Sequence, residues 1–114
     1  MAVIEFLADR IRNYLLDNYI EFFEKRMFGG LTFMVDNKMC VGLIKDKMMT
    51  RIGPDVYEIA LLKEGCSEMI FTGKPIIGYV FLNDEATDLD KDLEYWIQLA
   101  LDFNPLAKAS KKKK

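Results

Sequence analysis

The sequence lacks most of the side chains that carry enzyme chemistry. It has no histidine, and its two serines are Ser67 and Ser110. Ser–His and Cys–His nucleophile pairs are therefore excluded, as is every metal site that needs an imidazole ligand. The two cysteines, Cys40 and Cys66, are too few for an all-cysteine zinc site within one chain. We expect no catalytic residue, no metal site and no cofactor.

Two motifs that suggest a ligand are incomplete. Asp88-x-Asp90-x-Asp92 resembles the start of a calcium loop, but the loop requires Gly and Glu where this chain has Leu93 and Leu99. Gly73-Lys74 lacks the earlier glycine and the following Ser or Thr of a phosphate-binding P-loop. We interpret the aspartates as the first turn of a helix, and Gly73-Lys74 as part of a turn.

Long apolar runs and disulfide patterns are also missing. The longest apolar stretch, Ile76 to Leu82, is far shorter than the roughly 20 residues of a membrane-spanning helix. Glu5 and Asp9 interrupt the N-terminal segment, which does not resemble a signal peptide. The cysteines form no CxxC unit, so we expect reduced, buried thiols. A chain of 114 residues, 51% of them hydrophobic, predicts one cytoplasmic domain with a genuine core.

The charge is unevenly distributed. Five lysines, Lys108 and Lys111 to Lys114, lie in the last seven residues, and without them 11 basic residues face 18 acidic ones. An acidic body is a poor match for the phosphate backbone of nucleic acid. We expect residues 106–114 to form a disordered Lys-rich tail, and direct nucleic-acid binding to be weak and confined to it.

Hydrophobic spacing predicts three helices. Residues 3–18 repeat apolar side chains at three- and four-residue steps, and we expect this helix to end at Asn18. Pro54 suits a first helical turn and Gly65 suits a stop, so a second helix is expected between them. The last helix is expected to end at Pro105. Its apolar face is expected to comprise Leu89, Leu93, Trp96, Ile97, Ala100 and Phe103.

β-Branched and aromatic runs between the helices predict three or four antiparallel strands, then two more. Asp36-Asn37 is a two-residue hairpin signal, and Lys45-Asp46-Lys47 and Gly73-Lys74-Pro75 are further turns. The expected strands are one from about Glu21, then Leu31–Val35, Lys38–Ile44, Met48–Ile52, Glu68–Phe71 and Ile76–Leu82. This order predicts a two-layer α+β domain over residues 1–105, with an antiparallel sheet.

The two adjacent glycines, Gly29 and Gly30, invite a ligand-binding interpretation. A phosphate-binding glycine loop runs into a helix N-terminus, whereas here strand-like residues follow, so a tight turn or bulge is the simpler interpretation. The alternative is that a missing side chain lets a ligand or partner backbone approach closely. Arg51 is open to two interpretations, one as a solvent-facing or Glu24-paired residue and one as an interface anchor. The candidate binding residues are Arg26, Met27, Phe28, Gly29, Gly30 and Arg51.

The stretch Arg26–Val35 resembles the signature of the TfoX N-terminal domain family, also called TfoX/Sxy. The stretches Met48–Pro54, Met69–Val80 and Asp92–Ile97 resemble later parts of it in order and spacing. The resemblance implies an α-β(3)-α-β(2)-α domain of the secretion-chaperone-like type. It also implies a link to transcription, because full TfoX/Sxy proteins regulate competence genes with a catabolite activator protein at promoters. Those proteins carry a C-terminal domain that we expect this chain to lack.

Together with the resemblance, the missing catalytic residue types predict a small, non-enzymatic module that binds protein. Its regulatory role and its homodimeric state are what the resemblance implies. The partners that the resemblance implies are transcription machinery or a catabolite activator protein. One alternative is a small-molecule sensor or enzyme with a pocket near Arg26, Phe28, Gly29, Gly30 and Arg51. Another is direct DNA binding through the lysine tail.

Overall fold

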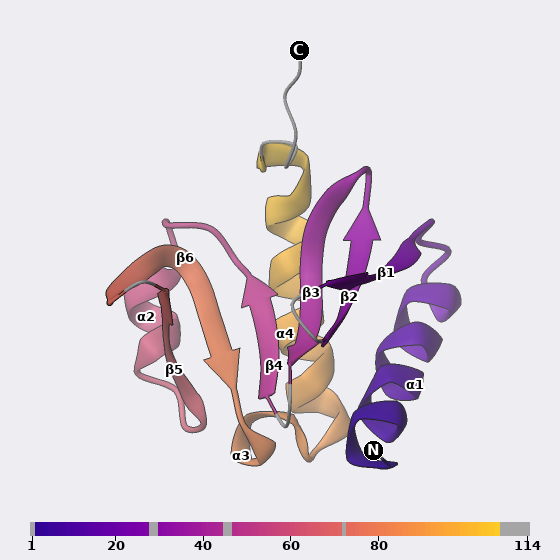
Figure 1. Ribbon diagram of the computed structural model, residues 1–114, viewed down its shortest axis with the longest axis horizontal. Coiled ribbons are helices and arrows are strands. Elements are labelled where there is room, and N and C mark those ends of the chain that lie inside the picture. Colours follow the sequence, from indigo (N-terminus) through magenta and orange to yellow (C-terminus); the bar gives the residue numbers. More distant parts are fainter. Residues whose placement is uncertain (1, 28–29, 45–46, 72, 108–114) are drawn as a thin grey trace.

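The computed structural model describes residues 2–27, 30–44, 47–71 and 73–107, shown in Figure 1. Helices flank two runs of strands. The elements are α1 (Ala2–Asp17), β1 (Phe23–Met27), β2 (Gly30–Val35), β3 (Lys38–Ile44), β4 (Lys47–Arg51), α2 (Tyr57–Leu61), β5 (Cys66–Phe71), β6 (Lys74–Leu82), α3 (Asp84–Thr87), α4 (Asp90–Phe103) and the 3₁₀ turn η1 (Asn104–Leu106).

The strands form one antiparallel sheet in the order β1-β2-β3-β4-β6-β5. β1 to β4 are consecutive neighbours, and β6 pairs with both β4 and the edge strand β5. Asp36 and Asn37 have φ angles of 58° and 63°, the positive values that a two-residue hairpin turn requires. The predicted α+β architecture with an antiparallel sheet is therefore confirmed.

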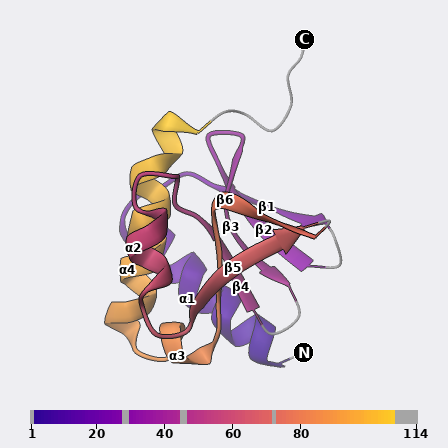
Figure 2. The ribbon, with the colours of Figure 1, turned by 90° about the vertical axis from the view of Figure 1, so that its left-hand side faces the viewer.

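The helices cover one face of the sheet. Figure 2 shows α2 and α4 together on one side of the strands, and α1 packs into the same core. Fully buried core side chains include Ile11, Leu15, Phe33, Val41, Leu43, Met48, Val80, Leu82 and Ile97. The core therefore lies between one face of the sheet and the helices, while the opposite face carries no helix among the described elements.

The end of α1 agrees with the sequence prediction. Tyr19 has a φ of 59°, and the amide of Ile20 donates to the carbonyl of Leu15 at 2.9 Å. The side-chain amide of Asn18 donates to the carbonyl of Tyr14 at 2.8 Å. These bonds satisfy carbonyls that the last helical turn leaves without partners, so the helix ends where residue 18 was expected to end it.

The predicted bounds of the middle segment were wrong in detail. The helix expected from Pro54 to Gly65 is the five-residue α2, because turns occupy the residues on either side of it. Lys74 and Pro75, expected in a turn, are strand residues of β6 and pair with Phe71 and Ile70. Of the turn expected at residues 45–47, Lys47 belongs to β4 and the other two residues lie outside the described part.

The C-terminal third differs from the prediction in two places. The short helix α3 was not predicted, and Leu89 caps α4 with 58% of its surface exposed instead of joining the buried face. Four strands precede α2, one more than the order implied by the family resemblance. Of the segment expected to form the lysine tail, Leu106 ends η1 and Ala107 is buried. Residues 108–114 lie outside the described residues.

Candidate functional site

The face of the sheet opposite the helices has an apolar centre. Met48 and Thr50 of β4 point into the core, so strand alternation places Met49 and Arg51 on the other side. Met49 pairs in register with Phe81 of β6, which shares this side. We call this side the open face.

A hollow of about 340 Å³ lies on the open face. Its lining is apolar and includes three methionines from three different strands. The lining residues are Met39, Ile44, Met49, Met69, Ile70, Ile76, Tyr79 and Phe81. Methionine is unbranched and adapts its shape to what it contacts, so such a lining suits an apolar occupant of variable shape.

A bulge and a glycine shape the floor of the hollow. Phe33 pairs with Val41 while the next residue, Met34, pairs with Met39, so Cys40 is an extra residue in β3. Because of the extra residue, Val41 and Met39 point to opposite faces of the sheet. Val41 lies in the core and Met39 lines the hollow. A Cβ at Gly42 would lie 2.9 Å from the terminal methyl of Met49. Met49 therefore packs down onto the glycine backbone.

Two cations lie against the aromatic part of the lining. The Lys47 ammonium lies 5.3 Å from the ring centroid of Phe81, and the Arg51 guanidinium lies 5.4 Å from that of Tyr79. Arg51 also lies 5.9 Å from the ring centroid of Phe103, at the end of α4. Both distances to the lining fall in the range of cation–π attraction.

The structure does not bring the predicted binding residues together. Arg26 is exposed at the edge strand and shares its side of β1 with Glu24, which pairs with Arg12 of α1. Arg51 lies three strands away on the open face, about 14 Å by strand spacing alone. The suggested pairing of Arg51 with Glu24 was therefore wrong, because Arg12 holds that carboxylate and lowers its pKa through the hydrogen bond and its charge.

Gly30 opens β2, and its missing side chain serves the packing of the sheet. Its Cβ would lie 2.1 Å from the carbonyl oxygen of Leu43 and 3.1 Å from Ile44, which lines the hollow. The missing side chain lets two strands of the sheet approach each other. Phe28 and Gly29 lie outside the described residues, and of Met27 only the backbone pairing with Gly30 is described.

Neither thiol is prepared for nucleophilic chemistry. Burial raises the pKa of Cys40 to about 12 and that of Cys66 to about 11. A thiol with so high a pKa is almost entirely protonated at neutral pH, and the thiolate is the reactive form. Both cysteines are free, Cys40 buried and Cys66 half-buried.

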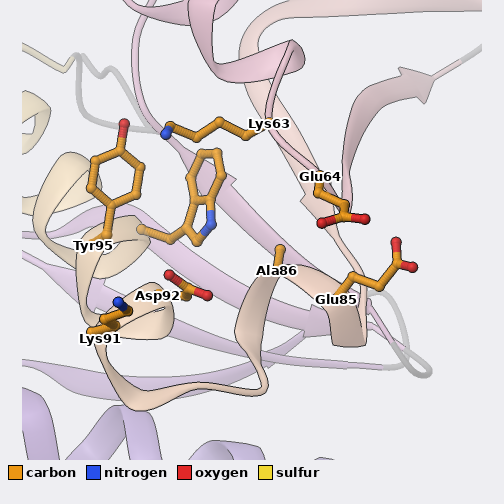
Figure 3. Close-up of a pocket in the computed structure, with 8 residues that line it drawn as sticks. Lys63, Glu64, Glu85, Ala86, Lys91, Asp92 and Tyr95 are labelled. Atoms are coloured by element: carbon orange, nitrogen blue, oxygen red, sulfur yellow. The ribbon is translucent and has the colours of Figure 1, made fainter.

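A second hollow, of about 520 Å³, lies on the helix side between the segment after α2, α3 and α4 (Figure 3). Lys63 extends toward Tyr95, with its ammonium 4.8 Å from the ring centroid, while Glu64 and Glu85 face each other across the other end. Charges of both signs line it, and water solvates such a lining well. It lacks the continuous apolar floor of the open-face hollow, which is therefore the stronger candidate for binding.

Two features that the described residues lack bear on function. Across the ranges that the structure describes, no group of three or more Cys, Asp or Glu side chains is placed to hold a metal ion. None of the described helices is both long and apolar enough to cross a membrane.

Sequence reasoning missed the open-face hollow, although a signal for it was present. In β4, the run Lys-Met-Met-Thr-Arg places one methionine on each face of the strand, so neither face is plainly polar. The same is true of Tyr-Val-Phe-Leu in β6. A half-solvated strand alternates apolar and polar residues. Two apolar faces on strands with only one layer of helices would have indicated an exposed apolar surface.

The family profile described as TfoX N-terminal domain matches residues 15–104, which extend from the end of α1 to the start of η1. No curated protein and no solved structure gives a significant match to the chain. The profile covers most of the 114 residues and every strand of the sheet. The chain belongs to the TfoX N-terminal domain family.

Proposed function

We propose that this protein is a small non-enzymatic regulatory module of the cytoplasm that acts by binding another protein through the open face of its sheet. The absence of histidine and the two protonated thiols argue against nucleophilic catalysis. Free cysteines are typical of proteins in a reducing compartment. The regulatory role follows the family, whose full-length members regulate competence genes.

The observation that carries the proposal is the uncovered methionine-rich hollow. A contiguous apolar patch left exposed on a domain is a mark of an interaction site, whereas apolar side chains exposed singly are common on any surface. Ile70, which lines the hollow, leaves 51% of its surface exposed, whereas a side chain in the closed core is covered almost completely. Arg51 and Tyr79, which lie against each other, are residue types enriched at the energetic centres of protein interfaces.

A matched pair of substitutions tests the proposal. Ile70 and Ile77 are exposed to similar extents, 51% and 58%, but only Ile70 lines the hollow. We expect the full chain to capture a protein from native lysate, Ile70→Glu to abolish the capture, and Ile77→Glu to preserve it. A wild-type chain that captures nothing and is monomeric in solution would refute the proposal, as would equal loss of capture by both variants.

The family context also leads us to propose a homodimer, with transcription machinery or a catabolite activator protein as the partner class. Light scattering measures the solution mass directly, and a dimer is expected for both the wild-type chain and Ile70→Glu. A wild-type monomer would refute the dimer. A dimer dissociated by Ile70→Glu would show that a second copy of the chain occupies the hollow.

A second candidate function is the binding of a small apolar molecule in the same hollow. Its volume of about 340 Å³ is within the range of small-ligand pockets, roughly 300–1,000 Å³. The pocket adjoins Arg51 through Tyr79 and Gly30 through Ile44. Native mass spectrometry of chain purified from its own cell would reveal a bound molecule, and its absence after gentle purification would count against this candidate.

A further inference from the structure

We propose that the partner segment received by the open-face hollow is acidic and apolar, with an apolar side chain flanked by carboxylates. This inference rests on the proposed function, namely that a protein binds this face. It adds the chemistry of that protein, which the distribution of charge over the two faces of the sheet indicates.

The two faces of the domain differ in charge. Strand alternation places Lys25, Lys47 and Arg51 on the open face, and none of the described strand positions that share this face is acidic. The acids of the strands, Glu24 and Glu68, pair with residues that point to the core. The helix side carries most of the remaining carboxylates, among them those of α3 and of the first turn of α4. The open face is therefore cationic although the body of the chain is acidic.

The two cations beside the hollow are available to a partner. The ion pairs found among the described residues involve Arg10 and Arg12, and none involves Lys47 or Arg51. Both lie over the aromatic rings of the lining, which hold them at the rim without neutralising their charge. A carboxylate brought to this rim would find a positive partner at little cost in rearrangement.

The spacing of the cations sets the spacing of the carboxylates. Lys47 and Arg51 are four residues apart on β4, so their Cα atoms lie about 13 Å apart along the strand. An extended segment matches that distance with acids at positions i and i+4. Its residue i+2 then points to the same side, between the two acids and toward the hollow. The expected pattern is thus an acid, an apolar residue two positions later and an acid two positions after that.

Single-stranded nucleic acid is the competing occupant of a cationic sheet with aromatic residues. Such platforms require ring faces that are free for bases to stack on. Here Lys47 and Arg51 already lie over the rings of Phe81 and Tyr79. The lining of the hollow is made mostly of aliphatic and methionine side chains, which better suit an apolar side chain than a planar base.

A phage-displayed library of random linear peptides, selected on the full wild-type chain, tests the inference. We expect enriched peptides that carry an apolar residue between acids and that fail to bind Ile70→Glu. An enriched peptide, fluorescently labelled, should bind Lys47→Glu about fivefold more weakly than wild type, which is the upper end of the effect of one exposed charge contact. Lys91→Glu reverses an exposed lysine on α4 and should bind as the wild type does. Lys47 is itself exposed, so its reversal leaves the core intact.

The outcomes separate this inference from the proposed function. Enriched peptides that are apolar without acids, yet still need Ile70, would overturn the inference and leave protein binding at the hollow supported. Peptides insensitive to both Ile70→Glu and Lys47→Glu, or no enrichment at all, would overturn both. A labelled oligothymidylate that binds the wild-type chain and competes with the enriched peptides would overturn the inference in favour of nucleic acid.

Discussion

Replacing Gly30 by alanine tests whether this glycine serves the close approach of two strands. The new Cβ would lie 2.1 Å from the carbonyl oxygen of Leu43, where ordinary contact begins at 3.4 Å. The strands would have to separate by about 1.3 Å, the difference between those two distances, which breaks the hydrogen bonds at that end of the β2–β3 ladder. Overpacking costs about 1–3 kcal/mol and each lost hydrogen bond about 0.5–1.5 kcal/mol. We expect a loss of about 2–4 kcal/mol.

For a domain of this size, that loss lowers the melting temperature by more than about 8 °C, since 1 kcal/mol corresponds to roughly 4–8 °C. Circular dichroism during thermal unfolding measures it. Gly73→Ala is the matched control, because Gly73 has a φ of +83° but nothing within 4 Å of a new Cβ. It should lose only about 1 kcal/mol, from backbone strain. A Gly30→Ala protein that melts with the wild type, or above Gly73→Ala, would refute the steric explanation.

Three further predictions concern other parts of the domain. Leu93→Ala should lower the free energy of unfolding, measured by chemical denaturation, by about 2–5 kcal/mol because Leu93 is 2% exposed. Leu89 is 58% exposed, so Leu89→Ala should change it by no more than about 0.5 kcal/mol. Glu24→Gln should lower the free energy of unfolding by about 0.5–1 kcal/mol at neutral pH. Because its ion pair lowers the pKa of Glu24 below 4.5, that difference should vanish as the pH falls through the lowered value, in denaturation curves recorded at each pH. Thr50→Val should increase the free energy of unfolding by about 1 kcal/mol, and so raise the denaturant midpoint, since the Thr50 hydroxyl is buried without a partner among the described residues.

The sequence predicted those features of the fold that depend on neighbours along the chain. Asp36-Asn37 fixed a hairpin because both residues tolerate positive φ, and the apolar spacing of residues 3–18 fixed the first helix. Leu89 was misplaced because its spacing fits the face of the last helix, while the chain enters that helix one residue later. Helix bounds at Pro54 and Gly65 failed because those residues also suit the turns that flank a shorter helix.

The candidate site could not be predicted because it depends on which strands are neighbours. Phe81 lies beside Met49 only because β6 enters the sheet between β4 and β5. Likewise, the partner that Gly30 must approach is Leu43, 13 residues further along the chain. The sequence drew attention to Arg51 and the glycine pair, but strand order places Arg51 three strands away from Arg26, and register places the two residues on opposite faces of the sheet.

The insertion of β6 has a further consequence, for how the domain holds together. The sheet consists of two parts that are each local in sequence: the meander β1–β4 and the hairpin β5–β6. A single ladder, β4–β6, joins them within the sheet, and its pairs include Met49 with Phe81 and Arg51 with Tyr79. The hollow straddles this seam. A molecule seated there contacts both parts at once, so its binding free energy also opposes their separation. Occupancy and folding are thereby coupled, and amide hydrogen exchange along β4 and β6 would slow when the hollow is filled.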